Sequence, residues 1–167
     1  MADLSDVKKL LREVVGANPN LPITATVLSV TGDRCKVKLK SGLELTDVKL
    51  KATINDSENY ILVTPKANSK VQILSLSGRL DNMTVIKVDE VEKIEIVQGE
   101  LDIIIDSTDN KVGVKNSVCS LKDLFQEFAD LLKQLKVYTP AGPSGTPLPD
   151  SILAITQLET KFNQLLK

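Results

Sequence analysis

The feature that most restricts the fold is a series of short strand-like segments between residues 23 and 90. The clearest is Arg34–Lys40, in which apolar residues alternate strictly with basic ones. A period of two is typical of a strand with one buried face. Turns that contain Gly32 and Gly42 bound this segment on both sides. Repeated short strands separated by such turns predict a small closed antiparallel barrel.

We expect about five or six strands in this barrel, including Tyr60–Thr64 and Met83–Val88. The apolar residue Val48 has the opposite parity to Leu45, so the strand that holds both needs a bulge or bend near Asp47. An OB-like barrel over residues 23–90 fits the pattern best, and an SH3-like barrel is the alternative.

Residues 1–22 are typical of an N-terminal amphipathic helix followed by a linker. Apolar residues recur at helical spacing from Leu4 to Val15, and Pro19 and Pro22 prevent the helix from continuing. The apolar stripe of this helix can pack on its own chain or on a partner, and the sequence leaves both interpretations open.

Residues 91–118 also have strand character, with three lysines against six acidic residues. Their apolar positions alternate in three short runs: Ile94, Ile96, Leu101, Ile103, Ile105, Val112 and Val114. Three strands this short cannot bury both faces by themselves. We therefore predict a short β-stalk segment in which these seven residues form an interface between copies of the chain.

Residues 119–167 predict a C-terminal antiparallel helical hairpin. Ser120 is a good N-cap with Asp123 three positions later, and Asp150 can cap the second helix after the proline- and glycine-rich loop 137–149. Two apolar stripes follow helical spacing: Leu121, Leu124, Phe125, Phe128, Leu131 and Leu135, then Ile155, Leu158, Phe162 and Leu165. These stripes can pack within one chain or against other subunits, and both remain open.

The composition argues against most enzyme classes. The chain has no histidine, so it lacks a Ser-His-Asp or Cys-His arrangement and a histidine metal ligand. Cys35 and Cys119 are far apart and neither has a CxxC partner, which argues against a zinc site. The net charge is −1, and apolar runs are too short for a membrane span. We predict a non-enzymatic protein without catalytic residues, cofactor or metal.

Two chemical alternatives are open. Asp102 and Asp106 share a strand face by parity and could serve a carboxylate-based hydrolase, although a solvated outer face explains them more simply. The basic side of Arg34–Lys40 could bind a single-stranded nucleic acid, but the only aromatic residue of the predicted barrel is Tyr60. Because stacking on aromatic platforms supports such binding, we expect no nucleic-acid partner.

The order of these elements resembles that of the hub and spike proteins of contractile phage tails, of the baseplate-assembly-protein-V type, and of related injection systems. Residues 61–74 look like that family's strand-turn-strand, with Asn68 in the place of its usual glycine, and residues 85–94 look like the passage from barrel to stalk. Asparagine tolerates a positive φ better than most residues, which fits the turn. The resemblance covers roughly residues 23–118.

The resemblance implies an OB-fold domain followed by a trimeric β-structured stalk, and a structural role as a hub, spike or adaptor. It further implies a homotrimer, contacts with other baseplate or tail proteins, and a place in the tail of a virion or injection particle assembled in the bacterial cytoplasm. A single-stranded nucleic-acid-binding protein is the alternative from another class. A chaperone or adaptor whose helices bind a partner transiently is a third interpretation.

Overall fold

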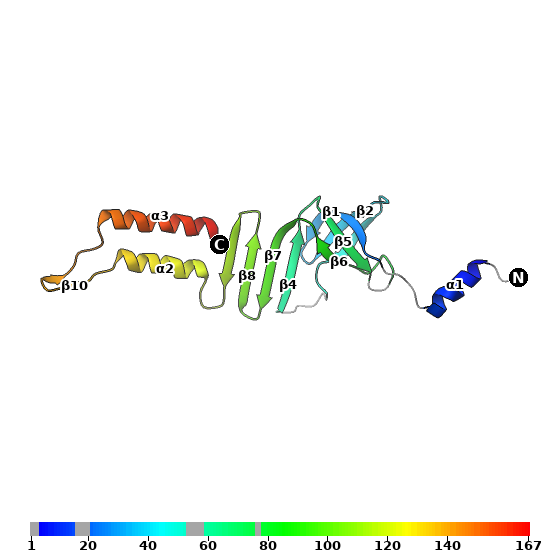
Figure 1. Cartoon of the computed structure of the whole chain (residues 1–167), viewed down its shortest axis with the longest axis horizontal. Helices are drawn as coiled ribbons and strands as arrows, with labels where there is room; N and C mark the ends of the chain where they lie inside the picture. Colours follow the sequence, from blue (N-terminus) through cyan, green and yellow to red (C-terminus); the bar gives the residue numbers. More distant parts are fainter. Residues whose placement is uncertain (1–3, 16–20, 53–58, 76–77) are drawn as a thin grey trace. The chain divides into compact units, whose positions relative to one another are not determined.

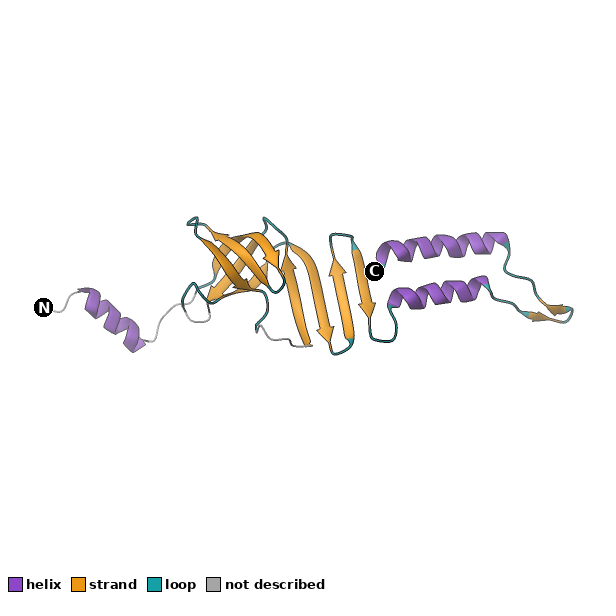
Figure 2. Cartoon of the chain, turned by 180° about the vertical axis from the view of Figure 1, so that it is seen from behind, coloured by secondary structure: helices purple, strands orange, loops and turns teal. Residues whose placement is uncertain are grey.

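The computed structural model of the chain describes residues 4–15, 21–52, 59–75 and 78–167. These residues are mainly β-structure with three helices, as Figure 2 shows. The chain divides into two compact units, which are described separately below. One unit holds Met1–Ile54 and Pro65–Glu90, and the other holds Asn55–Thr64 and Val91–Lys167.

The first unit contains a closed barrel of five strands (Figure 1). The barrel strands are β1 (Ile23–Thr31), β2 (Arg34–Leu39), β3 (Glu44–Lys49), β5 (Lys70–Ser75) and β6 (Met83–Val88). They follow the order β1-β2-β3-β6-β5, and the barrel closes because β1 pairs with both β2 and β5. The contact between β3 and β6 is parallel, and the other pairings are antiparallel. This arrangement is compatible with an OB-like barrel.

The barrel core follows from the alternating pattern of its strands. Val27, Val37 and Ile73 are fully buried within one cluster of eight buried residues. The bulge predicted near Asp47 is confirmed. Between the pairs Cys35–Val48 and Val37–Leu45, one residue of β2 lies opposite two residues of β3. The predicted turn at Asn68 is also confirmed, with φ of 66°.

Cys35 lies in this core, and its burial raises the pKa of the thiol to about 11. Cys119 is only half-buried. We therefore expect that an alkylating reagent at pH 8 modifies Cys119 in the native protein and reaches Cys35 only after the barrel unfolds. Peptide mass spectrometry after timed alkylation measures both rates. Equal native rates would contradict this account, and denatured protein, in which both thiols should react, is the control.

The second unit contains a four-stranded sheet, in which β7 pairs with β8 and β8 with β9 in antiparallel fashion. Its strands follow the order β4-β7-β8-β9 and comprise β4 (Asn59–Pro65), β7 (Val91–Gln98), β8 (Leu101–Asp106) and β9 (Lys111–Lys115). The prediction that Tyr60–Thr64 belongs to the barrel is therefore wrong. This strand is apolar at successive positions rather than alternate ones, so its pattern does not specify which sheet it joins. Gly99 N–H donates a hydrogen bond of 2.6 Å to the Asn59 side chain within this sheet.

The helices are α1 (Leu4–Val15), α2 (Leu121–Lys133) and α3 (Pro149–Leu165). Ser120 caps α2 as predicted, in a reciprocal capping box with Asp123. Asp150 does not cap α3, because the N-cap is Leu148 and Pro149 occupies the first helical turn, where its missing N–H is not needed. Loop 137–149 contains two short paired strands that the sequence did not indicate, β10 (Tyr138–Thr139) and β11 (Gly142–Pro143).

Helices α2 and α3 lie side by side (Figures 1 and 2). Ala129 of α2 is fully buried in a small cluster with Phe162 and Leu166. The rings of Phe125 and Phe162 have centroids 5.5 Å apart. Among the described residues, no helix has the length and apolar character needed to cross a membrane. In α1, the side chains of Val7 and Leu10 are exposed, so this part of its apolar stripe is accessible to solvent.

Candidate assembly surface

The seven predicted interface residues share one face of the four-stranded sheet, which we call the aliphatic face. The antiparallel register places Ile94 opposite Ile105 and Ile96 opposite Ile103 between β7 and β8. Between β8 and β9, it places Ile103 opposite Val114 and Ile105 opposite Val112. Because directly opposed residues point to the same side of a sheet, these side chains form one continuous surface. Leu101 lies on the same face by alternation along β8.

The aliphatic face is not covered within the second unit. None of its seven residues is buried, and Leu101 and Ile105 remain 40% and 47% exposed. The seven residues belong to neither of the two buried clusters found in the described part of the chain. A hollow of about 330 Å³ opens on this face, lined by Ile94, Ile105 and Val112 together with polar neighbours.

The opposite face of the same strands is charged, and its charges pair with one another. Lys93 Nζ lies 2.7 Å from Glu95 Oε1 along β7. Lys115 Nζ of β9 lies 3.3 Å from Asp102 Oδ2 of β8, its direct cross-strand partner. A charged face whose ions are matched is stable against water, whereas an aliphatic face gains free energy when it is covered.

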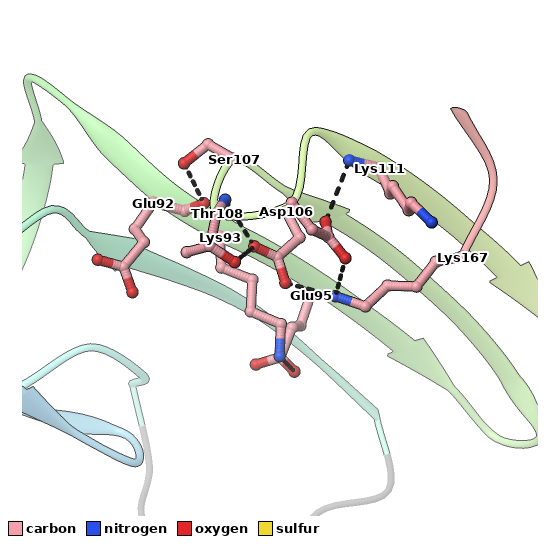
Figure 3. A network of polar contacts seen from close by, with 9 residues as sticks. Glu92, Lys93, Glu95, Asp106, Ser107, Thr108, Lys111 and Lys167 are labelled. Carbon is pink, nitrogen blue, oxygen red and sulfur yellow. Dashed lines mark hydrogen bonds and ion pairs between the residues drawn. The ribbon is translucent and has the colours of Figure 1, made fainter. Parts of the chain in front are cut away.

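Asp106 is the most constrained charge of this face (Figure 3). Its Oδ2 accepts a hydrogen bond of 2.5 Å from Lys167 Nζ, and its Oδ1 accepts bonds from the backbone and hydroxyl of Thr108. Lys167 first and Thr108 second hold the pKa of Asp106 well below its usual range. The hydrogen bonds to Asp106 and Asp109 raise the pKa of Lys167 in turn.

The Asp106 ion pair predicts a specific dependence of stability on pH. A carboxyl group with a lowered folded-state pKa contributes stability above its unfolded pKa, about 3.9, and loses it as pH falls toward the folded value. We expect Asp106→Asn to lower the free energy of unfolding at pH 7 and to approach the wild-type value in acid. Urea titrations from pH 7 to pH 2 measure both curves.

Asp81→Asn removes the same charge from an exposed carboxylate and is the control for net charge. It should leave the pH dependence of unfolding close to that of the wild-type protein. A constant difference between Asp106→Asn and wild type at every pH would contradict the assigned role of the ion pair.

The predicted helix-packing residues separate into two groups. Four of them help to join α2 to α3: Leu121, Phe125, Ile155 and Phe162. The remaining six are exposed: Leu124, Phe128, Leu131, Leu135, Leu158 and Leu165. Lys133 and Gln126 of α2 both donate hydrogen bonds to Glu159 of α3, and Lys133 lowers the pKa of that carboxyl. The sequence patterns did not indicate this polar contact.

A second contact that the sequence did not indicate joins the helices to the sheet. Leu166 forms a parallel bridge with Val112, and Lys167 N–H donates a hydrogen bond of 3.0 Å to Val112 O. The Lys167 side chain reaches Asp106 from there. A single lysine after a helix carries no local pattern that would point to a partner 61 positions earlier.

The two chemical alternatives find little support in these contacts. Asp102 and Asp106 each form an ion pair with a lysine, and a lowered pKa at Asp106 is the reverse of what a general acid needs. On the basic strand, Arg34 pairs with Asp47, and Lys36 Nζ lies 2.7 Å from Glu44 Oε2. Within the described ranges, we find no group of three or more His, Cys, Asp or Glu side chains that could hold a metal ion.

Neither a scan against protein-family models nor a search of curated proteins gives a match to this chain.

Proposed function

We propose that this protein is a structural component, a hub, spike or adaptor, of a phage tail baseplate or a related contractile injection system. It acts by assembly with copies of itself, and the proposed assembly is a trimer. The observation that carries this proposal is the aliphatic face: seven apolar residues on one side of a sheet whose other side is charged and internally paired.

Burial of this face supplies the driving force for assembly. Apolar surface removed from water contributes about 25 cal/mol per Å². Three copies that turn their aliphatic faces toward a common axis would enclose Ile94, Ile103 and Ile105 and leave the paired charges in water. The sheet would then act as a short β-stalk, in which each copy covers the face that the others leave open.

The assignment to a tail structure rests on the resemblance together with the order of the two folds. After β6, the last barrel strand, the chain continues into β7, β8 and β9, which carry the aliphatic face, as expected for an OB-like domain that leads into a stalk; the fourth strand of the sheet, β4, comes between barrel strands β3 and β5. The positive φ of Asn68, which stands where the resembling family has glycine, supports the proposed strand-turn-strand of β4 and β5.

The proposal is tested in tail or injection particles purified from cells that produce this chain. Quantitative mass spectrometry should find the chain in the particles at a multiple of three copies per baseplate. A variant with a charged aliphatic face, Ile103→Lys, should be expressed but absent from the particles. Particles that assemble fully without the chain would contradict the proposal.

A further inference from the structure

Helix α2 has a second apolar side that α3 does not cover. Ala129, at the centre of the α2–α3 contact, is fully buried. On a helix of 3.6 residues per turn, the side away from Ala129 carries three large apolar residues of α2, and a fourth follows two residues after the helix ends at Lys133. These are Leu124, Phe128, Leu131 and Leu135, which are 50%, 52%, 63% and 51% exposed. We call them the outer stripe of α2.

The outer stripe has the spacing of a coiled-coil seam. Within α2, Leu124, Phe128 and Leu131 are separated by four and three residues, which places Leu124 and Leu131 at d positions and Phe128 at an a position of a heptad. This spacing keeps apolar residues aligned with a helix that carries the same repeat. A second α2 carries that repeat by definition.

The outer side of α3 differs from that of α2. Gln157, Thr160 and Gln164 are exposed there, with Leu153 among them. The Thr160 hydroxyl donates a hydrogen bond of 3.0 Å to Thr156 O in the preceding turn. A face of this composition is stable in water, so the helix pair has an apolar side on α2 and a largely polar side on α3.

The connection from the sheet to α2 fixes where the outer stripe begins. β9 ends at Lys115, and the Asn116 side chain accepts hydrogen bonds of 2.9 Å from the backbone of both Val118 and Cys119. The capping box at Ser120 then starts α2. Copies joined through their aliphatic faces would therefore all begin α2 at the same level and send it in the same direction.

We propose that the α2 helices of neighbouring copies pack against each other in parallel through Leu124, Phe128 and Leu131, with Leu135 just beyond the end of each helix and α3 on the outside of the resulting bundle. The occupant of the outer stripe is thus a second copy of this chain. This inference rests on the proposed function, because the sheet supplies the parallel alignment.

The charges of α2 bear on whether two α2 helices pack in parallel or antiparallel, and this direction can be tested. Its first half holds Lys122, Asp123 and Glu127, for a charge of −1, and Asp130 and Lys133 of its second half together with Lys136 after the helix give +1. Charge matching alone would favour an antiparallel pair, because opposite ends would then meet. The proposed sheet contact favours the parallel arrangement, in which identical residues meet.

Disulfide cross-linking of the full-length chain separates these arrangements. Cys119→Ala removes the half-buried thiol, and Cys35 stays protected in the barrel. In this background, Leu124→Cys and Leu135→Cys each place one thiol at one end of the outer stripe. Gln157→Cys on α3 is the matched control at an exposed helical position.

Under mild oxidation, Leu124→Cys alone should form linked chains and lose most of its monomer band on a non-reducing gel, and Leu135→Cys should behave likewise. Gln157→Cys should remain monomeric on the same gel. Linkage only in a mixture of Leu124→Cys and Leu135→Cys would show antiparallel packing and overturn the inference. Absence of linkage in all samples would also overturn it.

Sedimentation of the same variants separates failure of this inference from failure of the proposed function. Oligomers that do not cross-link through α2 would overturn the coiled coil and leave assembly through the sheet in place. Monomers would overturn both. Because Leu124 and Leu135 are half exposed, substitution with cysteine should leave the fold intact, which circular dichroism checks.

Discussion

Ile103→Lys is expected to convert the assembled protein into monomers at micromolar concentration. Ile103 lies on β8, the strand flanked by β7 and β9, and faces Ile96 on one side and Val114 on the other. An ammonium group in the middle of this face would be buried without a partner in each copy of the assembly. A penalty of about 4 kcal/mol per charge corresponds to roughly a thousandfold weaker association.

The matched control is Ile104→Lys, the same substitution one residue further along β8. Ile104 lies on the charged face, opposite Glu95 and between Asp102 and Asp106. A lysine there gains acidic neighbours and should leave the oligomer intact. Sedimentation velocity compares the two variants, and circular dichroism checks that both are folded. If both variants stay assembled, or both dissociate, the aliphatic face is not the interface.

Ile73→Ala is expected to destabilise the barrel by about 2–5 kcal/mol, the usual cost of removing a buried Ile side chain. Ile73 is fully buried on β5, where it pairs with Ile23 of β1 and Val85 of β6. The midpoint of barrel unfolding in urea should fall by on the order of 1–2 M. The rate at which Cys35 becomes reactive reports this transition, because Cys35 lies in the same core.

Ile86→Ala is the control for this experiment. Ile86 lies on β6 of the same barrel but is exposed, so its replacement should change stability by less than about 0.5 kcal/mol. Equal effects of the two substitutions on Cys35 labelling would contradict the position assigned to the barrel core.

Patterns of neighbouring residues in the sequence predicted the buried faces of strands, a bulge and the start of a helix. The alternation in Arg34–Lys40 placed Val37 in the core, and the parity change between Leu45 and Val48 located a bulge. Ser120 and Asp123 specified the start of α2, because a capping box needs only residues three positions apart. The aliphatic face was predictable for the same reason, since strand alternation assigns residues to faces before any pairing is known.

The pairing of strands and of charged side chains that are far apart in the sequence was not predictable from the same patterns. β4 joins β7 rather than the barrel, and its apolar run fits either sheet. Lys167 forms an ion pair with Asp106 of the sheet, and Lys133 of α2 forms one with Glu159 of α3. Both ion pairs depend on how elements that are distant in the sequence pack together. The expected cap at Asp150 failed because Pro149 favours the first turn and shifts the start of α3 by two residues.

The central claim is that the aliphatic face joins copies of this chain. Sedimentation equilibrium of the full-length wild-type protein across the micromolar range tests it most directly, because each chain has a mass of 18.2 kDa. The account predicts a single species with the mass of three chains, which the Ile103→Lys variant does not form. A wild-type protein that sediments with the mass of one chain throughout this range would contradict it.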